Sequence, residues 1–133
     1  MEFQAHLSSL QDIFNLLRVS FSTSEEIRKK IELAVEEVVV NIISYSKSPR
    51  IEVEVSEVAG VGYITIKDWG APFNPLSHAE KHQEKMPLEE ITEGGLGIFF
   101  LKKLMDEVTY ERLGDQNILR IKKTLFNAEE ATG

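Results

Sequence analysis

Cysteine is absent from this chain of 133 residues. Its absence excludes thiol nucleophiles, disulfide frameworks and cysteine-ligated zinc sites. The three histidines do not have the spacing of metal ligands beside paired acids, so neither a zinc site nor a Ser-His-Asp triad is expected. A chain of this length fits one domain that buries about two thirds of its unfolded surface, which is enough to be stable without a disulfide or a metal.

Long apolar runs are also missing, and so is an excess of positive charge. No apolar run approaches the roughly 20 residues that cross a bilayer, and the N-terminal residues lack the basic region and apolar core of a signal peptide. We therefore expect a cytoplasmic protein that does not associate with membranes. The formal net charge is -7 and the Lys and Arg residues are scattered, so direct binding to nucleic acid is not expected.

Helical periodicity marks three segments of the chain. The expected helices cover 8–19, 25–45 and 96–105. The middle helix is the longest, with about six turns free of Gly and Pro, and Thr23 with Glu26 matches a capping box at its start. Its apolar side is expected to run as far as Tyr45.

Alternating apolar and polar residues mark the strands. The expected strands cover 2–6, 51–56, 61–67, 108–113 and 117–126. The second and third form a half-solvated antiparallel hairpin around Ala59-Gly60, and the last two are joined at Gly114-Asp115. Residues 69–93 have little periodicity and are too long for a simple connection, so we expect a mobile lid there, and residues 127–133 are expected to form a flexible tail.

Three glycines lie directly before or within the start of the last expected helix. Gly94, Gly95 and Gly97 have no Cβ, so their backbone amides can approach an anion while the helix contributes its positive end. This pattern is typical of a phosphate-binding loop. A flexible turn before a core helix is the alternative, since glycine clusters also occur in ordinary loops.

A polar pair interrupts the apolar side of the long helix. Asn41 falls within that side, and Glu37 lies one turn earlier on the same flank, whereas Glu36 is expected to point toward solvent. A carboxylate that can accept a proton, beside an amide oxygen that can bind a hard cation, suits phosphoryl transfer from a magnesium nucleotide. The alternative is a surface glutamate and a core amide that neighbouring backbone satisfies.

An acidic residue closes the strand expected over 61–67. Asp68 is followed by Trp69, Gly70, Ala71 and Pro72, and Gly70 permits an abrupt turn. An ionised aspartate only accepts hydrogen bonds, so Asp68 can receive the exocyclic amine of adenine while the base lies against the backbone of Gly70. An Asx-type turn is the alternative.

The three motifs E-x-x-x-N, D-x-G-x-P and G-G-L-G, in this order and spacing, resemble those of the GHKL ATPases, which include gyrase, chaperone and histidine kinase types. Within these ATPases, the chain resembles the small bacterial anti-sigma-factor serine kinases of RsbW and SpoIIAB type, and the resemblance covers Glu2 to about Leu125. Glu93 and Pro72 stand where larger relatives have glycine, a feature shared with this branch.

The resemblance implies an α+β fold of Bergerat type, a two-layer α/β sandwich with helices on one face of a mixed, mostly antiparallel sheet, in an ATP-binding domain over 1–126. It implies Glu37 as general base and Asn41 as the Mg²⁺ ligand. The residues that it places around ATP are Asn41, Asp68, Gly70, Pro72, Gly94, Gly95, Leu96, Gly97 and Thr124. Lys122 stands where the family often has a threonine near adenine, and Thr124 is expected to face the same way.

In function, the resemblance implies an ATP- and Mg²⁺-dependent serine/threonine protein kinase that acts as an anti-sigma factor in transcription regulation. Such an enzyme sequesters a sigma factor and phosphorylates an anti-anti-sigma protein of the STAS fold. A homodimer is expected, with the apolar helix around 10–17 as its contact or, alternatively, packed within its own subunit. A non-catalytic, ATP-gated protein-binding module is the alternative function, and Glu37 favours the enzyme because a binding module needs no base there.

Overall fold

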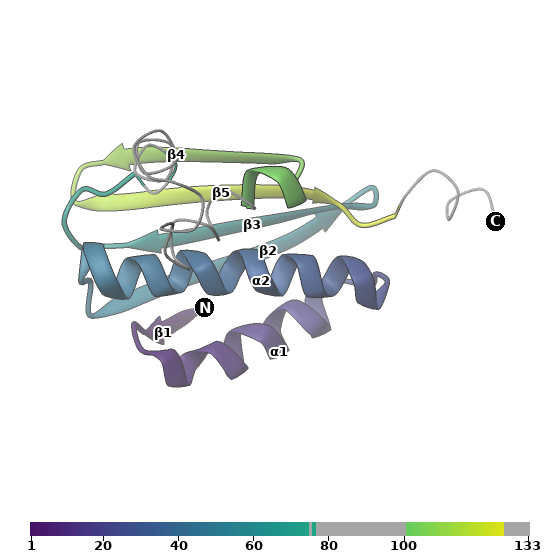
Figure 1. Cartoon of the computed structure of the whole chain (residues 1–133), viewed down its shortest axis with the longest axis horizontal. Coiled ribbons are helices and arrows are strands. Elements are labelled where there is room, and N and C mark those ends of the chain that lie inside the picture. Colours follow the sequence, from purple (N-terminus) through teal and green to yellow (C-terminus); the bar gives the residue numbers. More distant parts are fainter. Residues whose placement is uncertain (75, 77–100, 127–133) are drawn as a thin grey trace, which may run out of the picture.

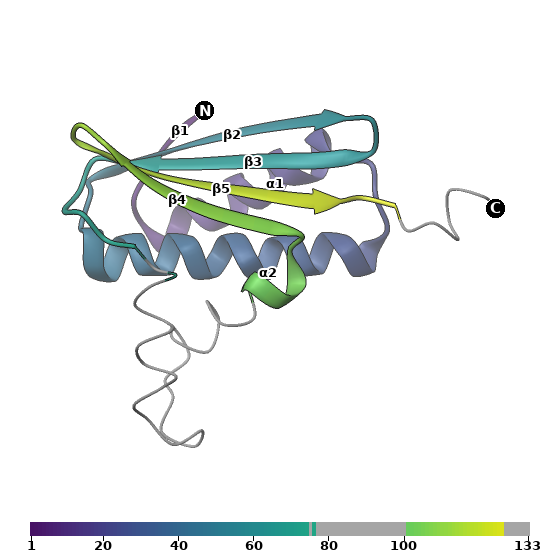
Figure 2. The same cartoon turned by 90° about the horizontal axis from the view of Figure 1, so that it is seen from above.

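The computed structural model describes residues 1–74, 76 and 101–126, which form a layer of helices on one face of a five-stranded sheet (Figures 1 and 2). The elements follow in the order β1 (Glu2–Gln4), the 3-10 turn η1 (Leu7–Ser9), α1 (Leu10–Ser20), α2 (Glu25–Asn41), the π-helical turn η2 (Ile42–Ser46), β2 (Arg50–Val58), β3 (Val61–Asp68), β4 (Glu107–Leu113) and β5 (Gln116–Thr124). Residues 101–104 are helical and are the described end of the third expected helix. Most of the expected lid and the whole expected tail lie outside the described residues.

The sheet has the strand order β1-β2-β3-β5-β4. The resemblance implies a mixed sheet, but every neighbouring pair of strands in the described part of the chain is antiparallel. The two expected hairpins are confirmed and account for much of this arrangement. In the β2–β3 hairpin, Ala59 (φ 52°) and Gly60 (φ 79°) both adopt the left-handed conformation that a two-residue turn requires.

The core lies between the sheet and the helices. Ile51, Val53, Ile64 and Ile66 point from β2 and β3 toward the helices and are at most 1% exposed, whereas Glu54 on the opposite face is exposed. This alternation confirms the expected half-solvated hairpin. The two-layer α+β arrangement predicted from the sequence is therefore present.

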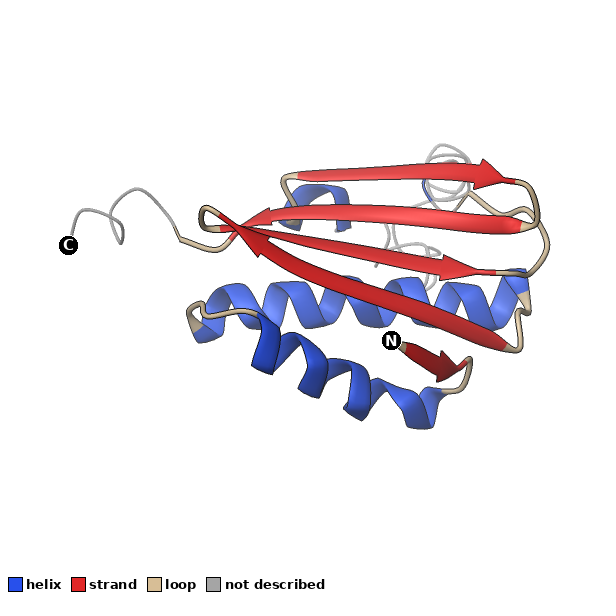
Figure 3. Cartoon of the chain, turned by 180° about the vertical axis from the view of Figure 1, so that it is seen from behind, coloured by secondary structure: helices blue, strands red, loops and turns tan. Residues whose placement is uncertain are grey.

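Helix α1 lies beside α2 and packs its apolar side into the core of its own subunit (Figures 1 and 3). Ile13 is 0% exposed and Leu17 is 2% exposed. Of the two alternatives for this helix, the structure supports packing within the subunit, so these side chains do not form a dimer contact. None of the helices in the described ranges is long and apolar enough to cross a membrane.

Helix α2 begins at Glu25, as predicted, but its N-cap lies one residue later than the predicted Thr23. Ser24 is the N-cap, with an extended backbone (φ -68°, ψ 158°) and a hydroxyl that accepts a hydrogen bond from the Ile27 N–H at 3.2 Å. The Thr23 hydroxyl instead donates to the Leu125 carbonyl at 2.6 Å. The predicted capping box of Thr23 and Glu26 is therefore wrong, because Thr23 ties the start of α2 to the end of the sheet.

The long helix does not continue unchanged to Tyr45. After Asn41 it widens into the π-helical turn η2, which ends at Lys47 in the left-handed conformation (φ 58°). The wider turn rotates the side chains that follow, so Ser46 is buried (4% exposed) while Tyr45 is 45% exposed. The apolar side of the helix was predicted to reach Tyr45, but the residue that is buried at this end is the polar Ser46.

Candidate functional site

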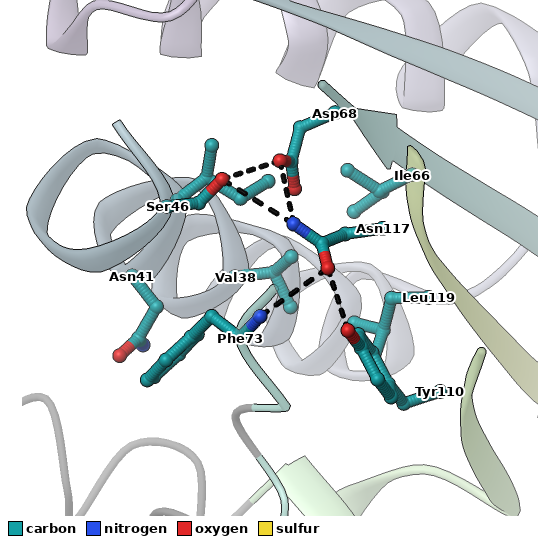
Figure 4. A pocket seen from close by; sticks show the side chains of 10 residues that line it. Val38, Asn41, Ser46, Ile66, Asp68, Phe73, Tyr110, Asn117 and Leu119 are labelled. Atoms are coloured by element: carbon teal, nitrogen blue, oxygen red, sulfur yellow. Dashed lines mark hydrogen bonds between the residues drawn. The ribbon is translucent and has the colours of Figure 1, made fainter. Parts of the chain in front are cut away.

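A small cavity lies where the end of β3, the start of β5 and the end of α2 meet (Figure 4). Asp68 on β3 pairs with Asn117 on β5 in the antiparallel register, and η2 brings Ser46 beside both. Val38, Ile66 and Leu119 form apolar walls of this cavity. A few polar groups inside an otherwise apolar cavity are typical of a small-molecule site.

Asp68 points into the cavity with one carboxylate oxygen fully engaged (Figure 4). Its Oδ1 accepts hydrogen bonds from the Ser46 hydroxyl, from the Gly70 N–H at 2.9 Å and from Asn117 Nδ2 at 2.9 Å. Among the described residues, none donates to Oδ2. The side chain is only 3% exposed, so this buried carboxylate presents a single acceptor to a ligand.

Asn117 also lies in this site, although it belongs to none of the three sequence motifs. Its Nδ2 donates to Asp68 and to the Ala71 carbonyl at 2.8 Å, and its Oδ1 accepts from the Tyr110 hydroxyl at 2.6 Å and from the Phe73 N–H at 3.3 Å. A signal for it was available: an asparagine starts the apolar strand expected over 117–126. Recognising it requires the strand register, because only the pairing shows that it lies opposite Asp68.

Thr124 does not belong to this cavity, and its predicted role near adenine is wrong. It pairs with Val61 at the other end of β5, seven residues from Asn117, which corresponds to more than about 20 Å along the strand. There its N–H donates to Asp106 Oδ2 at 2.5 Å. Because β5 runs antiparallel to β3, the end of β3 meets the start of β5, so neither Lys122 nor Thr124 reaches Asp68.

Gly70 and Pro72 lie in the turn that follows Asp68, as predicted. The turn packs directly on η2, and the Ala71 N–H donates to the Ser46 carbonyl at 3.0 Å. A Cβ on Gly70 would lie 2.1 Å from the Ser46 hydroxyl oxygen and 2.2 Å from the Ser46 carbonyl oxygen. Only glycine therefore fits between Asp68 and η2, while Pro72 is exposed.

Two arginines hold the same turn from outside the cavity. Arg112 Nη1 donates to the Gly70 carbonyl at 2.8 Å. The Arg50 guanidinium lies 3.9 Å from the centroid of the Trp69 ring and also pairs with Glu2 at 2.5 Å. The turn is thus fixed to β4 and to the first two strands, which keeps the backbone around Asp68 in one position.

Asn41 and Glu37 lie one turn apart on α2, as predicted. Asn41 is 4% exposed, lines the cavity and donates from Nδ2 to the Glu37 carbonyl at 2.6 Å. Because a carbonyl only accepts, this bond directs Asn41 Oδ1 away from the helix axis, and no described residue donates to that oxygen. An amide oxygen in this state suits a hard cation such as Mg²⁺.

Glu37 and Glu36 are both partly buried, so exposure alone does not separate them. The Oε2 atom of Glu37 is buried, which shows that this carboxylate turns toward the protein. Gly94, Gly95, Leu96 and Gly97 lie outside the described residues. The assignment of the phosphate loop therefore stays a prediction.

The cavity has a present volume of about 20 Å³, which is room only for about one water molecule. At least one lining side chain must therefore move before a base can enter. Phe73 is the lining residue outside the helices and strands, and its ring stacks on Tyr45 with centroids 4.7 Å apart and planes 11° apart. We expect Phe73 to shift when a base enters.

Comparison with known proteins identifies the family. Residues 3–123 match the histidine kinase-like ATPase domain. The chain is 26% identical over 122 residues to the serine-protein kinase RsbW of Staphylococcus epidermidis, covering 86% of this chain and 74% of that protein. These findings confirm the resemblance that the motifs indicated.

Solved structures agree in fold. The Acinetobacter baumannii histidine kinase AdeS superposes with a TM-score of 0.54 and 21% identity over 75% of this chain, and the blue-light activated histidine kinase EL346 of Erythrobacter litoralis with a TM-score of 0.53 and 22% identity over 75%. The chain spans about half the length of these two kinase chains, 48% and 45%. From the family match and the shared fold, the chain belongs to the histidine kinase-like ATPase domain family.

Proposed function

We propose that this protein is an ATP- and Mg²⁺-dependent serine/threonine protein kinase. The observation that carries the proposal is the geometry of Asp68, whose Oδ1 is held by three protein donors while Oδ2 is left for a ligand inside an apolar cavity. Asn41, which suits a cation, lines the same cavity. Membership of a family of ATPase domains supports ATP as the ligand.

In this proposal, different residues bind the base and the phosphates of the nucleotide. Asp68 Oδ2 accepts the exocyclic amine of adenine, with Gly70 and Pro72 beside the base. Asn41 Oδ1 holds Mg²⁺, and the amides of 94–97 hold the phosphates. Magnesium ATP, when bound, supplies the phosphoryl group. Glu37 accepts the proton of the substrate hydroxyl, which makes that oxygen a better nucleophile.

The cellular role is that of a cytoplasmic anti-sigma factor. The protein kinase named RsbW, which is 26% identical to this chain, supports this part of the proposal. The protein substrate is an anti-anti-sigma protein of the STAS fold, the sequestered partner is a sigma factor, and the kinase works as a homodimer. The dimer rests on the family resemblance alone, since α1 packs within its own subunit.

A non-catalytic, ATP-gated binding module is the second candidate. The position of Phe73 favours it, because a residue that must move when the base enters can transmit nucleotide binding to the segment that follows it. Both candidates bind ATP, and they differ in whether Glu37 is needed.

Phosphotransfer from labelled ATP to candidate STAS proteins, with mapping of the modified residue, tests the kinase. Glu37→Gln should lower the rate of transfer by about 100-fold or more while ATP binding is retained, because a general base contributes about that much. Glu36→Gln is the matched control on the same helix and should behave as wild type. Loss of transfer with Glu36→Gln but not Glu37→Gln would assign the base to the other glutamate. Binding of ATP and of a partner without any transfer would favour the module.

A further inference from the structure

Asn117 uses all of its hydrogen-bonding capacity on the protein. The Ala71 carbonyl can only accept and the Phe73 N–H can only donate, so these two backbone groups fix which end of the amide is nitrogen and which is oxygen. The Tyr110 hydroxyl donates to the same oxygen at 2.6 Å. Asn117 is 4% exposed and therefore has neither a free donor nor a free acceptor for a ligand.

The same amide determines how Asp68 presents its carboxylate. Of the three donors on Asp68 Oδ1, the Gly70 N–H comes from the adjacent turn and the Ser46 hydroxyl from η2. Asn117 Nδ2, at 2.9 Å, is the donor that reaches across from β5. With donors on three sides, Oδ1 is held in place and a rotation of the carboxylate would break all three bonds.

We propose that Asn117 is a positioning residue that sets the base specificity of this site. It holds Asp68 so that Oδ2 alone faces the base, as an acceptor for the amine of adenine and a repulsive neighbour for the carbonyl of guanine. Asn117 itself does not contact the base. The inference rests on the proposed ATP-binding function and assigns to this chain a determinant of nucleotide choice outside its three sequence motifs.

A positioning residue and a merely structural residue differ in how their loss changes the affinities for ATP and GTP. A structural residue supports the cavity as a whole, so its loss weakens ATP and GTP alike. Loss of the Asn117 donor leaves Asp68 Oδ1 with only the Ser46 and Gly70 donors, so the carboxylate is held less firmly. The repulsion of the guanine carbonyl then weakens together with the contact to the adenine amine. The ratio of the two affinities, rather than either affinity, is the informative quantity.

Calorimetry on the full chain with Mg²⁺ and ATP, GTP or the triphosphate of purine riboside, which lacks the amine, tests the proposal. Wild type should bind ATP more tightly than the other two. Asn117→Leu keeps about the volume of the side chain but removes its donors, and it should reduce the preference for ATP over GTP by about tenfold or more, as expected for a lost bond to a charged group. Asn117→Ala should do the same and serves if the leucine variant does not fold.

Gln116→Ala is the matched control, because it also removes an amide side chain at the start of β5, but Gln116 does not line the cavity. It should keep the wild-type preference. Equal losses of ATP and GTP affinity in the Asn117 variants would overturn the inference and leave ATP binding intact. Wild-type protein that binds ATP and the amine-free triphosphate equally would also overturn it. Failure of wild type to bind any of the nucleotides would overturn the proposed function itself.

Discussion

Gly70 is the residue whose replacement the structure tolerates least around the cavity. Its missing Cβ would collide with both the hydroxyl and the backbone carbonyl of Ser46, and a backbone atom cannot move aside cheaply. We predict that Gly70→Ala lowers the free energy of unfolding by about 1–3 kcal/mol or more, because the turn must separate from η2. It should also weaken ATP binding, since Ser46 and the Gly70 N–H both hold Asp68.

Denaturant unfolding of the variant, with ATP binding measured alongside, checks this prediction. Gly114→Ala is a suitable control, because a Cβ there meets no atom within 4 Å and only the left-handed backbone (φ 60°) opposes it. Gly114→Ala should therefore lower the free energy of unfolding by about 1–2 kcal/mol and leave ATP binding unchanged. A Gly70→Ala protein as stable as wild type would show that the turn can move without cost.

Asp106 lies at the end of the sheet opposite the cavity, and its lowered pKa makes the stability of the protein depend on pH. Partial burial raises the pKa of Asp106, but hydrogen bonds from Thr124 and the charges of Lys123 and Lys122 outweigh it and hold the pKa below its usual value. A lowered folded-state pKa stabilises the protein above the unfolded-state pKa, at about pH 4, and this stabilisation is lost as the pH falls through the folded-state pKa.

We predict that wild type exceeds Asp106→Asn in stability at neutral pH and that the difference shrinks below about pH 4. Asp106 is exposed, so solvent screening keeps the difference small. Urea unfolding of both proteins across this pH range measures it. A difference that grows with acidity would mean that Asp106 is not stabilised as a carboxylate.

Single residues were predictable where the local sequence decides their place. Glu37 and Asn41 share a helix, so their spacing alone brings them together, and Gly70 lies only two residues after Asp68. Asn117 and Thr124 depend on which strand lies beside β3 and in which direction. A residue placed only by strand pairing cannot be located from a motif, and this is why the sequence predicts Thr124, rather than Asn117, beside Asp68.

At the scale of elements, α2 is the helix on which the site depends, and Ser24 fixes where it starts. We predict that Ser24→Ala lowers the free energy of unfolding by about 1 kcal/mol, because the Ile27 N–H loses its acceptor. Ser22→Ala is the control, since Ser22 is exposed and makes no hydrogen bond with any described residue. Chemical unfolding of the two variants compares them, and equal stabilities would show that water replaces the cap.

The strands were easier to predict than the ends of helices. Period-two alternation and the turn residues at Ala59-Gly60 and Gly114-Asp115 place both hairpins within a residue or two. The π-helical turn after Asn41 has no comparable signal, because Ile42–Ser46 would also suit a regular helix. Its form is set by tertiary contacts, in which Ser46 bonds to Asp68 and accepts from the Ala71 N–H.

At the scale of the whole molecule, the motifs were sufficient to indicate the family, and the family resemblance implied the two layers that the structure has. The sequence was not sufficient to predict whether each strand pair is parallel or antiparallel. The β1–β2 and β3–β5 pairs join segments that are far apart in the sequence. The cavity joins α2, η2, β3, β4 and β5 through Asn41, Ser46, Asp68, Tyr110 and Asn117. Binding in this cavity should therefore stabilise the described domain as a unit.

Magnesium ATP should raise the midpoint of thermal unfolding more than ATP with a chelator does. A ligand at 100 times its dissociation constant adds about 2.7 kcal/mol, which raises the midpoint by about 5–10 °C for a domain of this size. The magnesium-dependent part of the rise should disappear in Asn41→Ala, because the amide oxygen that suits the cation is lost, while Glu36→Gln on the same helix should keep it. Differential scanning calorimetry of the full chain measures both quantities. An identical rise with and without magnesium in wild type would place the cation elsewhere or show that it is not required.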